Sequence, residues 1–279
     1  MTSPSKAFVV GYPIQHSRSP LIHGYWLRSH GLEGSYEKIA VAPDDFRDFV
    51  QGLAEQGFAG GNVTVPHKLA AYRLAEIRTD CAQKLEAANT LWFESGRLHA
   101  DNTDVTGFLA SLDAALGAWS ARARTALVLG AGGAARAVLT GLLDRGLRII
   151  VCNRSLERAE ALRAFDPDRV TAVGWNGMPD ALAGADLLVN ATSLGMAGQP
   201  PLAVDLAPLP GTAIVADIVY VPLETDLLAA ARRRGLATVD GLGMLLHQAV
   251  PGFARWFGVT PQVTPELRAL VVADIERGH

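Results

Sequence analysis

The chain has 279 residues, of which 49% are hydrophobic and 19% charged, and its formal net charge is −3. At roughly 150 residues per domain this length suggests two domains, and the composition provides a sizeable apolar core, which excludes an intrinsically disordered protein. The nearly balanced charge offers no basic surface that would favour nucleic acid or an anionic membrane as a partner.

The first hundred residues alternate short apolar runs with helix-like segments, which is typical of an α/β protein with parallel strands. We expect strands at 6–11, 37–41 and 59–66, helices at 19–32 and 43–57, and another helix from about Lys68. Ser19 is the candidate N-cap of the 19–32 helix, with Pro20 at its first position. Residues 88–104 predict a β-hairpin that turns at Ser95 and Gly96.

The second half continues the same alternation after a helix at 106–119, which could join two lobes. We expect a strand, a glycine turn and a helix over 126–146, strands at 147–152, 185–190 and 213–218, and helices at 156–165, 224–235 and 243–258. The three arginines at 232–234 close a predicted helix just before Gly235, where cations suit the negative end of the helix dipole.

Cysteine usage and the apolar runs bear on the compartment. Cys81 and Cys152 are too few for a disulfide framework and form no C-x-x-C pair. The apolar run before Gly11 is too short for a signal peptide, and no stretch reaches the ~18 apolar residues of a membrane span. We therefore expect a cytoplasmic protein without a membrane partner. The seven histidines show no zinc-ligand spacing, so no metal is expected.

The segment GAGGAA (130–135) follows a predicted strand, opens a predicted helix and has the form G-x-G-x-x-A. Gly130 would allow the tight turn, and Gly132 would let the backbone approach a pyrophosphate at the helix N-terminus. Ala135 would allow the helix to pack closely on the sheet. Because many strand–helix turns use glycine, an ordinary structural turn is the alternative interpretation.

The residues after the next strand distinguish NADP from NAD. An NAD site would place an acidic residue near the end of that strand, where it accepts hydrogen bonds from the ribose. This chain instead has Asn153, Arg154, Ser155 and Arg158, with no acid until Glu157. Arginines suit a 2′-phosphate, so the pattern favours NADP. The segment could also be an exposed helix start with Ser155 as its N-cap, and both interpretations can hold.

Polar clusters interrupt the first hundred residues at four places. Ser17 and Ser19 stand two apart at a strand-to-helix turn, where two hydroxyls could bind both oxygens of a carboxylate. An N-cap would explain Ser19 but not Ser17. The other clusters contribute Asn62, Thr64 and Lys68, then Asn89, and then Asp101, Asn102 and Asp104.

Lys68 and Asp104 suggest an acid–base device. An isolated lysine is ordinarily a surface residue, and Asp104 could be the N-cap of the 106–119 helix. In a cleft, however, an aspartate would orient the lysine, and a desolvated lysine can transfer a proton near neutral pH. The sequence alone does not show that the two side chains meet.

Taken together, these stretches resemble the shikimate dehydrogenase family, and the match runs nearly from end to end. The matching segments, in the family's order and spacing, are GYPIQHSRSP, NVTVPHK, AANTL, ADNTD, GAGGAARA, NRSLER, NATSLGM and DGLGMLLHQA. The resemblance implies an α/β fold with an N-terminal substrate domain and a Rossmann-type, doubly wound NADP-binding domain. It also implies a reversible, NADP-dependent reduction of 3-dehydroshikimate to shikimate, a step towards chorismate and the aromatic amino acids.

The resemblance also assigns roles to residues of this chain. Lys68 and Asp104 form the catalytic pair, and His67 is only a neighbour. The residues implied to bind the substrate are Ser17, Ser19, Asn62, Thr64, Asn89, Tyr220 and Gln248. Those implied to bind the cofactor are Gly130, Ala131, Gly132, Gly133, Ala134, Asn153, Arg154, Ser155, Arg158, Thr192, Gly241 and Met244.

The domain boundaries follow from the same resemblance. Residues 1–105 are expected to form the substrate domain and residues 106–243 the NADP-binding domain, with 244–279 packing back on the first. The cleft is expected to close on both ligands. The expected partner is a small-molecule substrate, and the chain is expected to be a monomer or a homodimer.

Two alternatives to the biosynthetic enzyme stay open. Val105 and Thr106 stand where the family commonly has a glycine directly after the aspartate, which leaves a catabolic quinate/shikimate dehydrogenase as one alternative. A relative that senses its ligand without turnover is the other, although an intact Lys68 and Asp104 argue against it.

Overall fold

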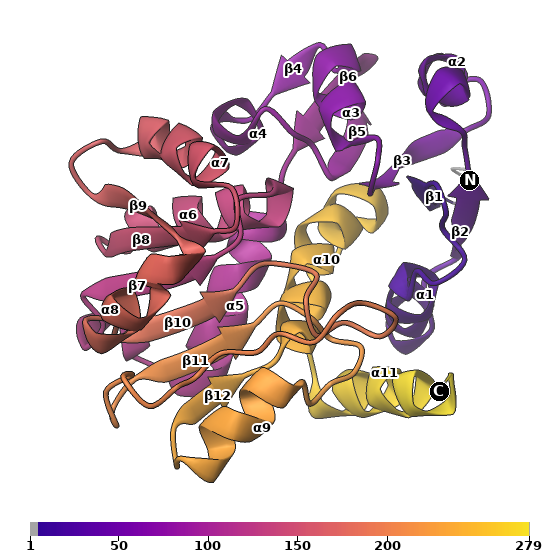
Figure 1. Cartoon of the computed structure of the whole chain (residues 1–279). Helices are drawn as coiled ribbons and strands as arrows, with labels where there is room; N and C mark the ends of the chain where they lie inside the picture. The colour runs from indigo at the N-terminus through magenta and orange to yellow at the C-terminus, as the bar shows by residue number, and fades with distance from the viewer. Residues whose placement is uncertain (1–4, 279) are drawn as a thin grey trace. The chain divides into compact units, whose positions relative to one another are not determined.

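The computed structural model of the chain describes residues 5–278, which fall into two compact units (Figure 1). The first unit runs up to Thr103 and resumes at Gln248, and the second comprises Asp104–His247. The chain therefore passes between the units twice, once after Thr103 and once inside the helix α10 (Gly241–Phe257). From the sequence, the first division was predicted two residues later, after residue 105. The second was predicted four residues earlier, before residue 244.

The first unit contains a mixed sheet with strand order β2-β1-β3-β5-β6-β4. Its elements before α10 are β1 (Ser5–Gly11), α1 (Ser19–Ser29), β2 (Gly34–Ala40), α2 (Phe46–Gln51), β3 (Phe58–Val63), α3 (Lys68–Leu74), β4 (Ile77–Arg78), α4 (Asp80–Leu85), β5 (Thr90–Glu94) and β6 (Arg97–Asp101). β1 is parallel to β2 and β3, whereas β5 is antiparallel to both β3 and β6. The carboxyl ends of β1 and β3 therefore lie at the same edge as the start of β5.

Successive side chains of each strand point to opposite faces of this sheet, and apolar side chains pack against both faces. Phe8 and Val10 of β1 pack with apolar residues of α2 and α3, whereas Ala7 packs on the other face with Trp256 of α10. The hairpin formed by β5 and β6 turns at Ser95 and Gly96, as the sequence predicted.

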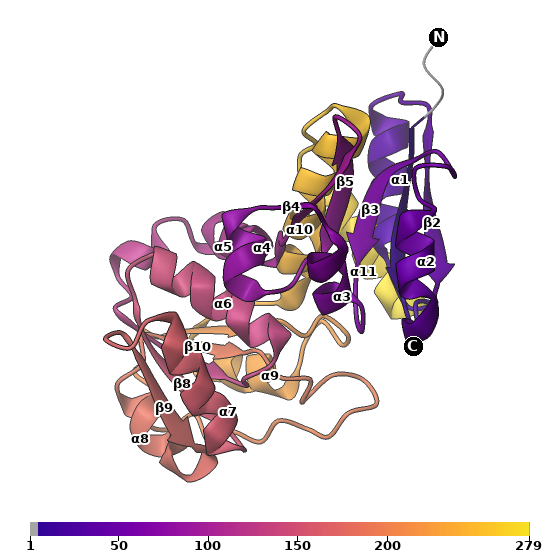
Figure 2. The same cartoon turned by 90° about the horizontal axis from the view of Figure 1, so that it is seen from above.

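The C-terminal residues from Gln248 onward belong to this first unit. The Trp256 indole donates a hydrogen bond to the Leu91 carbonyl (2.9 Å) in β5. The last helix, α11 (Pro265–Arg277), lies beside α1 (Figure 1 and Figure 2), where the Arg18 guanidinium pairs with Asp274 at 3.1 Å. The strands of the first unit and the C-terminal segment from Gln248 onward thus form one folded body.

The second unit is a parallel sheet with strand order β12-β11-β10-β7-β8-β9. Its elements before α10 are α5 (Asp104–Leu116), β7 (Thr125–Leu129), α6 (Gly133–Asp144), β8 (Arg148–Asn153), α7 (Leu156–Ala161), β9 (Val170–Gly174), α8 (Met178–Ala183), β10 (Leu187–Asn190), β11 (Ile214–Asp217), α9 (Asp226–Arg233) and β12 (Ala237–Val239). Chain order reverses between β7 and β10, which is where a doubly wound sheet binds its ligand.

Helices cover both faces of the parallel sheet. Ala126 and Val128 of β7 pack with α5, α6 and α7, whereas Leu127 and Leu129 pack with α8 and α9. This alternation within one buried strand is the expected pattern for a sheet enclosed on both sides. The predicted α/β class and Rossmann-type domain are confirmed.

Several elements differ from the sequence prediction. The helix expected over 43–57 is a 3-10 turn (Pro43–Asp45) followed by α2, which ends at Gln51. Ser19 is the first residue of α1 rather than its N-cap, a position that Arg18 occupies without a side-chain cap. The sequence also missed β4, α4, β9, α8, β12 and α11. Except for α11, these elements are too short to show a clear hydrophobic periodicity in the sequence.

A buried histidine gives the first unit a pH-dependent stability. His23 is fully buried in an aromatic cluster, stacked on the Tyr36 ring at 4.0 Å, and burial lowers the pKa of its imidazole to about 3. Below about pH 6.5 the unfolded chain binds a proton that the folded protein refuses, so stability falls as pH falls towards 3. His23 alone is therefore expected to remove about 1.7 kcal/mol of unfolding free energy between pH 6.5 and pH 5.

The measurement is urea unfolding at several pH values for the native protein and for His23→Leu. Averaged over this range, the unfolding free energy of the variant is expected to fall by about 1.1 kcal/mol less per pH unit than that of the native protein. His30→Leu is the control for the loss of an imidazole, because His30 is exposed at the end of α1. Equal slopes for the native protein and His23→Leu would contradict the prediction.

Candidate active site

In the first unit, the loops after β1 and β3 meet at the carboxyl edge of the sheet. The Tyr12 amide donates to the Val65 carbonyl (3.1 Å), and the Thr64 amide donates to the Val10 carbonyl (2.9 Å). The loop that carries Ser17 and Ser19 therefore begins beside the end of the strand that carries Asn62. Ser17 is half-buried, and its hydroxyl accepts a hydrogen bond from the Ser19 amide (3.4 Å), so Ser17 also has a local structural role.

Asn62 is buried at this edge, and its side-chain amide is held on both sides. Its Oδ1 accepts a hydrogen bond from the Tyr36 hydroxyl (2.6 Å), and its Nδ2 donates to the Asn89 carbonyl (3.1 Å). Burial raises the pKa of the Tyr36 phenol well above its ordinary value, so the phenol keeps the proton that it donates to Asn62. The orientation of Asn62 is thus fixed by the fold.

Asn89 is the centre of a second group of hydrogen bonds. Its Oδ1 accepts from the Thr103 amide (2.8 Å) and from the Thr90 hydroxyl (2.9 Å). Because Oδ1 receives these donors, Nδ2 points towards Gln248 Oε1, at 3.5 Å. The Thr103 hydroxyl also donates to the Gln248 carbonyl (2.8 Å), so Asn62, Asn89 and Gln248 are brought together.

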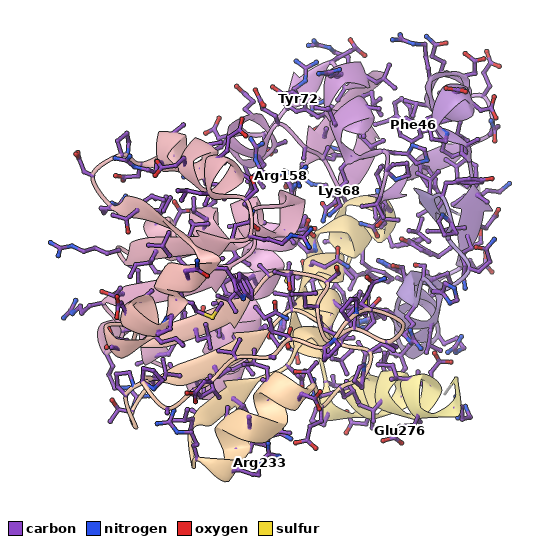
Figure 3. All side chains as sticks on the ribbon, viewed as in Figure 1. Phe46, Lys68, Tyr72, Arg158, Arg233 and Glu276 are labelled. Carbon is purple, nitrogen blue, oxygen red and sulfur yellow. The ribbon has the colours of Figure 1, made fainter. Side chains whose placement is uncertain are left out.

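Lys68 is the first residue of α3 and is half-buried (Figure 3). Its carbonyl accepts a hydrogen bond from the Ala88 amide (2.9 Å), which fixes its backbone next to Asn89. Asp104 directly follows Thr103 and begins α5 two residues earlier than the sequence predicted. Tyr220 follows β11 in the second unit and is half-buried.

Some of the polar residues in the clusters described from the sequence have structural roles. Asp101 Oδ1 accepts from the Thr79 hydroxyl (2.5 Å), and Asn102 Nδ2 donates to the Ala87 carbonyl (3.0 Å). His67 is buried, stacks on Phe46 at 4.3 Å and donates from Nε2 to a backbone carbonyl (2.8 Å). The role of His67 is thus to hold the strand end in place.

In the second unit, the glycines of the turn after β7 differ in whether the fold has room for a side chain at their position. Gly130 has φ +107°, and a Cβ there would come within 2.9 Å of Thr192 Cγ2, so the fold itself requires this glycine. A Cβ on Gly132 or Gly133 would meet open space, and Gly132 has φ −92°. Neither packing nor backbone strain explains Gly132, whereas close approach of a pyrophosphate would.

The start of α6 suits an anionic group. The helix begins at Gly133 with Gly132 as its N-cap, without a side-chain cap and without an acidic residue in the first turn. Ala131 and Ala134 are half-buried, and Ala131 packs against the sheet core. Backbone N–H groups at such a helix end bind phosphate readily.

The end of β8 presents two arginines to solvent. Arg154 and Arg158 are exposed, and within residues 5–278 no ion pair involves either guanidinium. Asn153 Nδ2 donates to the Ser155 carbonyl (2.9 Å), which shapes the turn between them. Ser155 occupies the N-cap position of α7, but its hydroxyl makes no capping hydrogen bond. These side chains could hold a 2′-phosphate.

The remaining predicted cofactor residues also lie in the second unit. Thr192 follows β10, and its Cγ2 lies close to Gly130. Met244, in α10, packs against the apolar core of the second unit. Gly241 begins α10, and a Cβ there would lie 2.2 Å from the Ile218 carbonyl oxygen. Its lack of a side chain is therefore required by the backbone of the loop after β11.

The part of the chain that the structure describes has neither a cluster of metal ligands nor a membrane-spanning helix. Within residues 5–278, no three histidine, cysteine, aspartate or glutamate side chains come together as a metal site would require. Over the same range, no helix is both long and apolar enough to cross a bilayer.

Comparison with known proteins assigns the family. Family models described as the shikimate dehydrogenase substrate binding domain, shikimate / quinate 5-dehydrogenase and the shikimate 5'-dehydrogenase C-terminal domain match residues 9–91, 114–197 and 241–270. A protein of Methylobacterium radiotolerans named shikimate dehydrogenase (NADP(+)) is 64% identical over 274 residues, with 97% of each chain covered. The chain belongs to the shikimate dehydrogenase family.

Solved structures of the family agree with the fold described above. Shikimate 5-dehydrogenase from Thermus thermophilus, in complex with NADP(H) and shikimate, is 34% identical with a TM-score of 0.85, covering 99% of this chain and 100% of that chain. Quinate dehydrogenase from Corynebacterium glutamicum, in complex with NAD, is 31% identical with a TM-score of 0.89, covering 97% of this chain and 99% of that chain.

Sequence reasoning missed three residues that shape this shikimate dehydrogenase-family site. Tyr36 and His23 form part of the support behind Asn62, and Thr103 holds Asn89. Thr103 stood inside the segment ADNTD, where a hydroxyl two residues after a strand signals a local hydrogen bond. Tyr36 and His23 gave no such signal, because single aromatic residues in a strand and a helix usually belong to the core.

Gly132 offers a test of the cofactor site that separates binding from folding. Because a Cβ there meets no protein atom within 4 Å, Gly132→Ala is expected to leave the melting temperature nearly unchanged. The methyl group would occupy the space that a pyrophosphate needs, so the Kd for NADPH is expected to rise at least about tenfold. Fluorescence titration of NADPH measures it.

The control for this substitution is Gly184→Ala. A Cβ on Gly184 also meets open space, but this residue lies before β10, at the opposite edge of the sheet. An unchanged NADPH affinity in Gly132→Ala would show that the glycine turn does not approach the cofactor.

Proposed function

We propose that this chain catalyses the reversible, NADP-dependent reduction of 3-dehydroshikimate to shikimate, with the residues of the two units in the roles given below. The observation that carries the proposal is the convergence of Asn62, Asn89 and Gln248 at one sheet edge, beside the backbone of Lys68. Fixed amides of this kind suit a polyhydroxylated ring, because each amide offers both a donor and an acceptor.

Substrate binding uses the first unit. Ser17 and Ser19 bind the substrate carboxylate, and Asn62, Thr64, Asn89 and Gln248 bind the ring hydroxyls. Tyr220 is also assigned to the substrate. The amides of Asn62 and Asn89 are already oriented by buried partners, so little side-chain entropy is lost when the substrate binds.

Cofactor binding uses the second unit. The pyrophosphate would be held at the start of α6 by residues 130–134, and the 2′-phosphate would be held by Asn153, Arg154, Ser155 and Arg158. Thr192, Gly241 and Met244 would lie on the nicotinamide side. When bound, the nicotinamide supplies or accepts the hydride.

Lys68 and Asp104 carry the proton. During reduction, a hydride reaches the carbonyl carbon of the substrate and the Lys68 ammonium gives a proton to the carbonyl oxygen, which becomes a hydroxyl. Lys68 is then a neutral amine that regains a proton from solvent. Asp104 orients the ammonium and stabilises its charge.

The test of this function is reduction of NADP⁺ by purified protein, with shikimate and quinate in parallel and NAD⁺ as the second cofactor. Turnover with shikimate and NADP⁺ well above the other combinations is the expected result. Equal or better turnover with quinate or NAD⁺ would assign the chain to the catabolic quinate branch. Binding of shikimate without any turnover would leave a ligand sensor as the better account.

A further inference from the structure

The side chain of Asn190 fixes the first residues of the loop after β10. Its Oδ1 accepts hydrogen bonds from the Thr192 amide (3.0 Å) and the Thr192 hydroxyl (2.7 Å). The Thr192 hydroxyl in turn accepts from the Leu194 amide (3.0 Å). Both the backbone and the hydroxyl of Thr192 are therefore fixed, and its methyl group is left against the Gly130 turn.

The orientation of the Asn190 amide is determined by its neighbours. A backbone N–H can only donate, so the oxygen of Asn190 must face Thr192 and its Nδ2 must face the other way. There Nδ2 donates to the Leu194 carbonyl (3.2 Å) and to Asp217 Oδ1 (2.9 Å). A flipped amide would place its oxygen against two acceptors.

Asp217 is the buried anchor of this arrangement. It ends β11, pairs in register with Asn190 and is only 2% exposed. Besides Asn190, the Val219 amide donates to its Oδ1 (3.0 Å) and the Thr225 hydroxyl to its Oδ2 (2.7 Å). Burial raises the pKa of this carboxyl, and the three donors oppose that shift. A carboxylate that accepts all three hydrogen bonds is costly to bury, which argues for a specific task.

Asp217 also lines a cavity together with the other element assigned to the nicotinamide side. Together with Met244 of α10 and Ser111 of α5, it lines a cavity of about 10 Å³. The same carboxylate is thus connected through Asn190 to Thr192 and borders the surroundings of Met244.

We propose that Asp217 is a positioning residue for hydride transfer, which acts by orienting the Asn190 amide and, through it, Thr192. The proposal rests on the proposed function, in which Thr192 lies beside the nicotinamide. Removing the carboxylate releases the amide, the loop 191–196 loses its single arrangement, and the nicotinamide side of the site is no longer held in one geometry. A misplacement of about 1 Å in such a site can cost about 10²-fold in rate.

A comparable carboxylate in the same sheet provides the control. Asp186 Oδ2 accepts from the Arg124 amide (2.7 Å) and the Thr125 amide (3.0 Å), but it precedes β10 and lies at the amino edge of the sheet. A role confined to stability would make Asp186→Leu and Asp217→Leu behave alike. A positioning role affects the Asp217 variant alone.

The experiment measures kcat, the KM for NADP⁺ and the Kd for shikimate in Asp217→Leu, Asp217→Asn, Asn190→Ala and the double variant Asn190→Ala/Asp217→Leu. We expect Asp217→Leu and Asn190→Ala each to lower kcat by about 10- to 100-fold, while the Kd for shikimate stays within about twofold. The double variant should be no slower than either single one, since both act through the same amide. Asp217→Asn, which keeps the shape and an acceptor oxygen, should recover most of kcat.

Amide hydrogen exchange without cofactor provides a readout besides activity. Exchange in residues 191–196 should be faster in Asp217→Leu and in Asn190→Ala than in the native protein, and unchanged in Asp186→Leu. Native exchange in that loop, or rate losses that multiply in the double variant, would overturn the proposal. If Asp217→Leu does not fold, Asn190→Ala and Asp217→Asn still decide it. Native protein that does not turn over shikimate would instead contradict the proposed function, and the exchange result would still stand.

Discussion

Lys68→Met is expected to lower kcat by about 10²–10⁴-fold, with the KM for shikimate and for NADP⁺ changed only a few-fold. Methionine keeps nearly the length of lysine but cannot donate a proton, so the forming alkoxide would have to be protonated by water. The substrate would still meet the oriented amides of Asn62 and Asn89, which are held by other residues. Steady-state kinetics in both directions measures the effect.

Two further variants make this result specific to proton transfer. Lys68→Arg keeps the positive charge, but a guanidinium does not release its proton near neutral pH, so kcat should remain low. Lys6→Met is the control, because Lys6 is exposed near the amino end of β1, at the opposite edge from Asn62. A Lys68→Met enzyme with native kcat would remove Lys68 from the mechanism.

The double substitution Arg154→Ser/Arg158→Ser is expected to weaken NADP⁺ far more than NAD⁺. Two charge-assisted hydrogen-bonding groups would be lost from the 2′-phosphate, each worth about 1.5–3 kcal/mol, or at least about tenfold in Kd. NAD⁺ has no phosphate there, so its Kd should change less than about threefold. Calorimetric titration of the two cofactors gives the ratio directly.

Arg163→Ser is the matched control for the cofactor prediction. Arg163 is also an exposed arginine of the same segment, but it pairs with Glu160 (3.1 Å) in the turn after α7. Its loss should leave the affinities for both cofactors unchanged. A parallel loss of NADP⁺ and NAD⁺ affinity in the Arg154/Arg158 variant would show that these arginines act on the fold of the loop.

The glycine turn and the residues after β8 could be predicted from the sequence because their structure is local. A strand, a tight turn and a helix start follow one another within a few residues, and the φ of +107° at Gly130 appears where the pattern placed the turn. The hairpin at Ser95 and Gly96 was predictable for the same reason. Both of these residues have positive φ, which turns of this kind commonly require.

The support behind the candidate site could not be predicted, because it joins residues far apart in the chain. Thr103 and Gln248 are separated by 145 residues, and Trp256 and Leu91 by 165, yet each pair shares a hydrogen bond. No periodicity relates such pairs. Asp217 and Asn190 illustrate the same limit: each ends an apolar strand, and only the parallel register of β10 and β11 places one opposite the other.

The chain is expected to reduce 3-dehydroshikimate with NADPH. The most direct test is to add 3-dehydroshikimate to the purified protein and NADPH, to follow NADPH consumption, and to identify the product by chromatography. We expect one shikimate formed for each NADPH consumed. No NADPH consumption, or a product other than shikimate, would contradict the account.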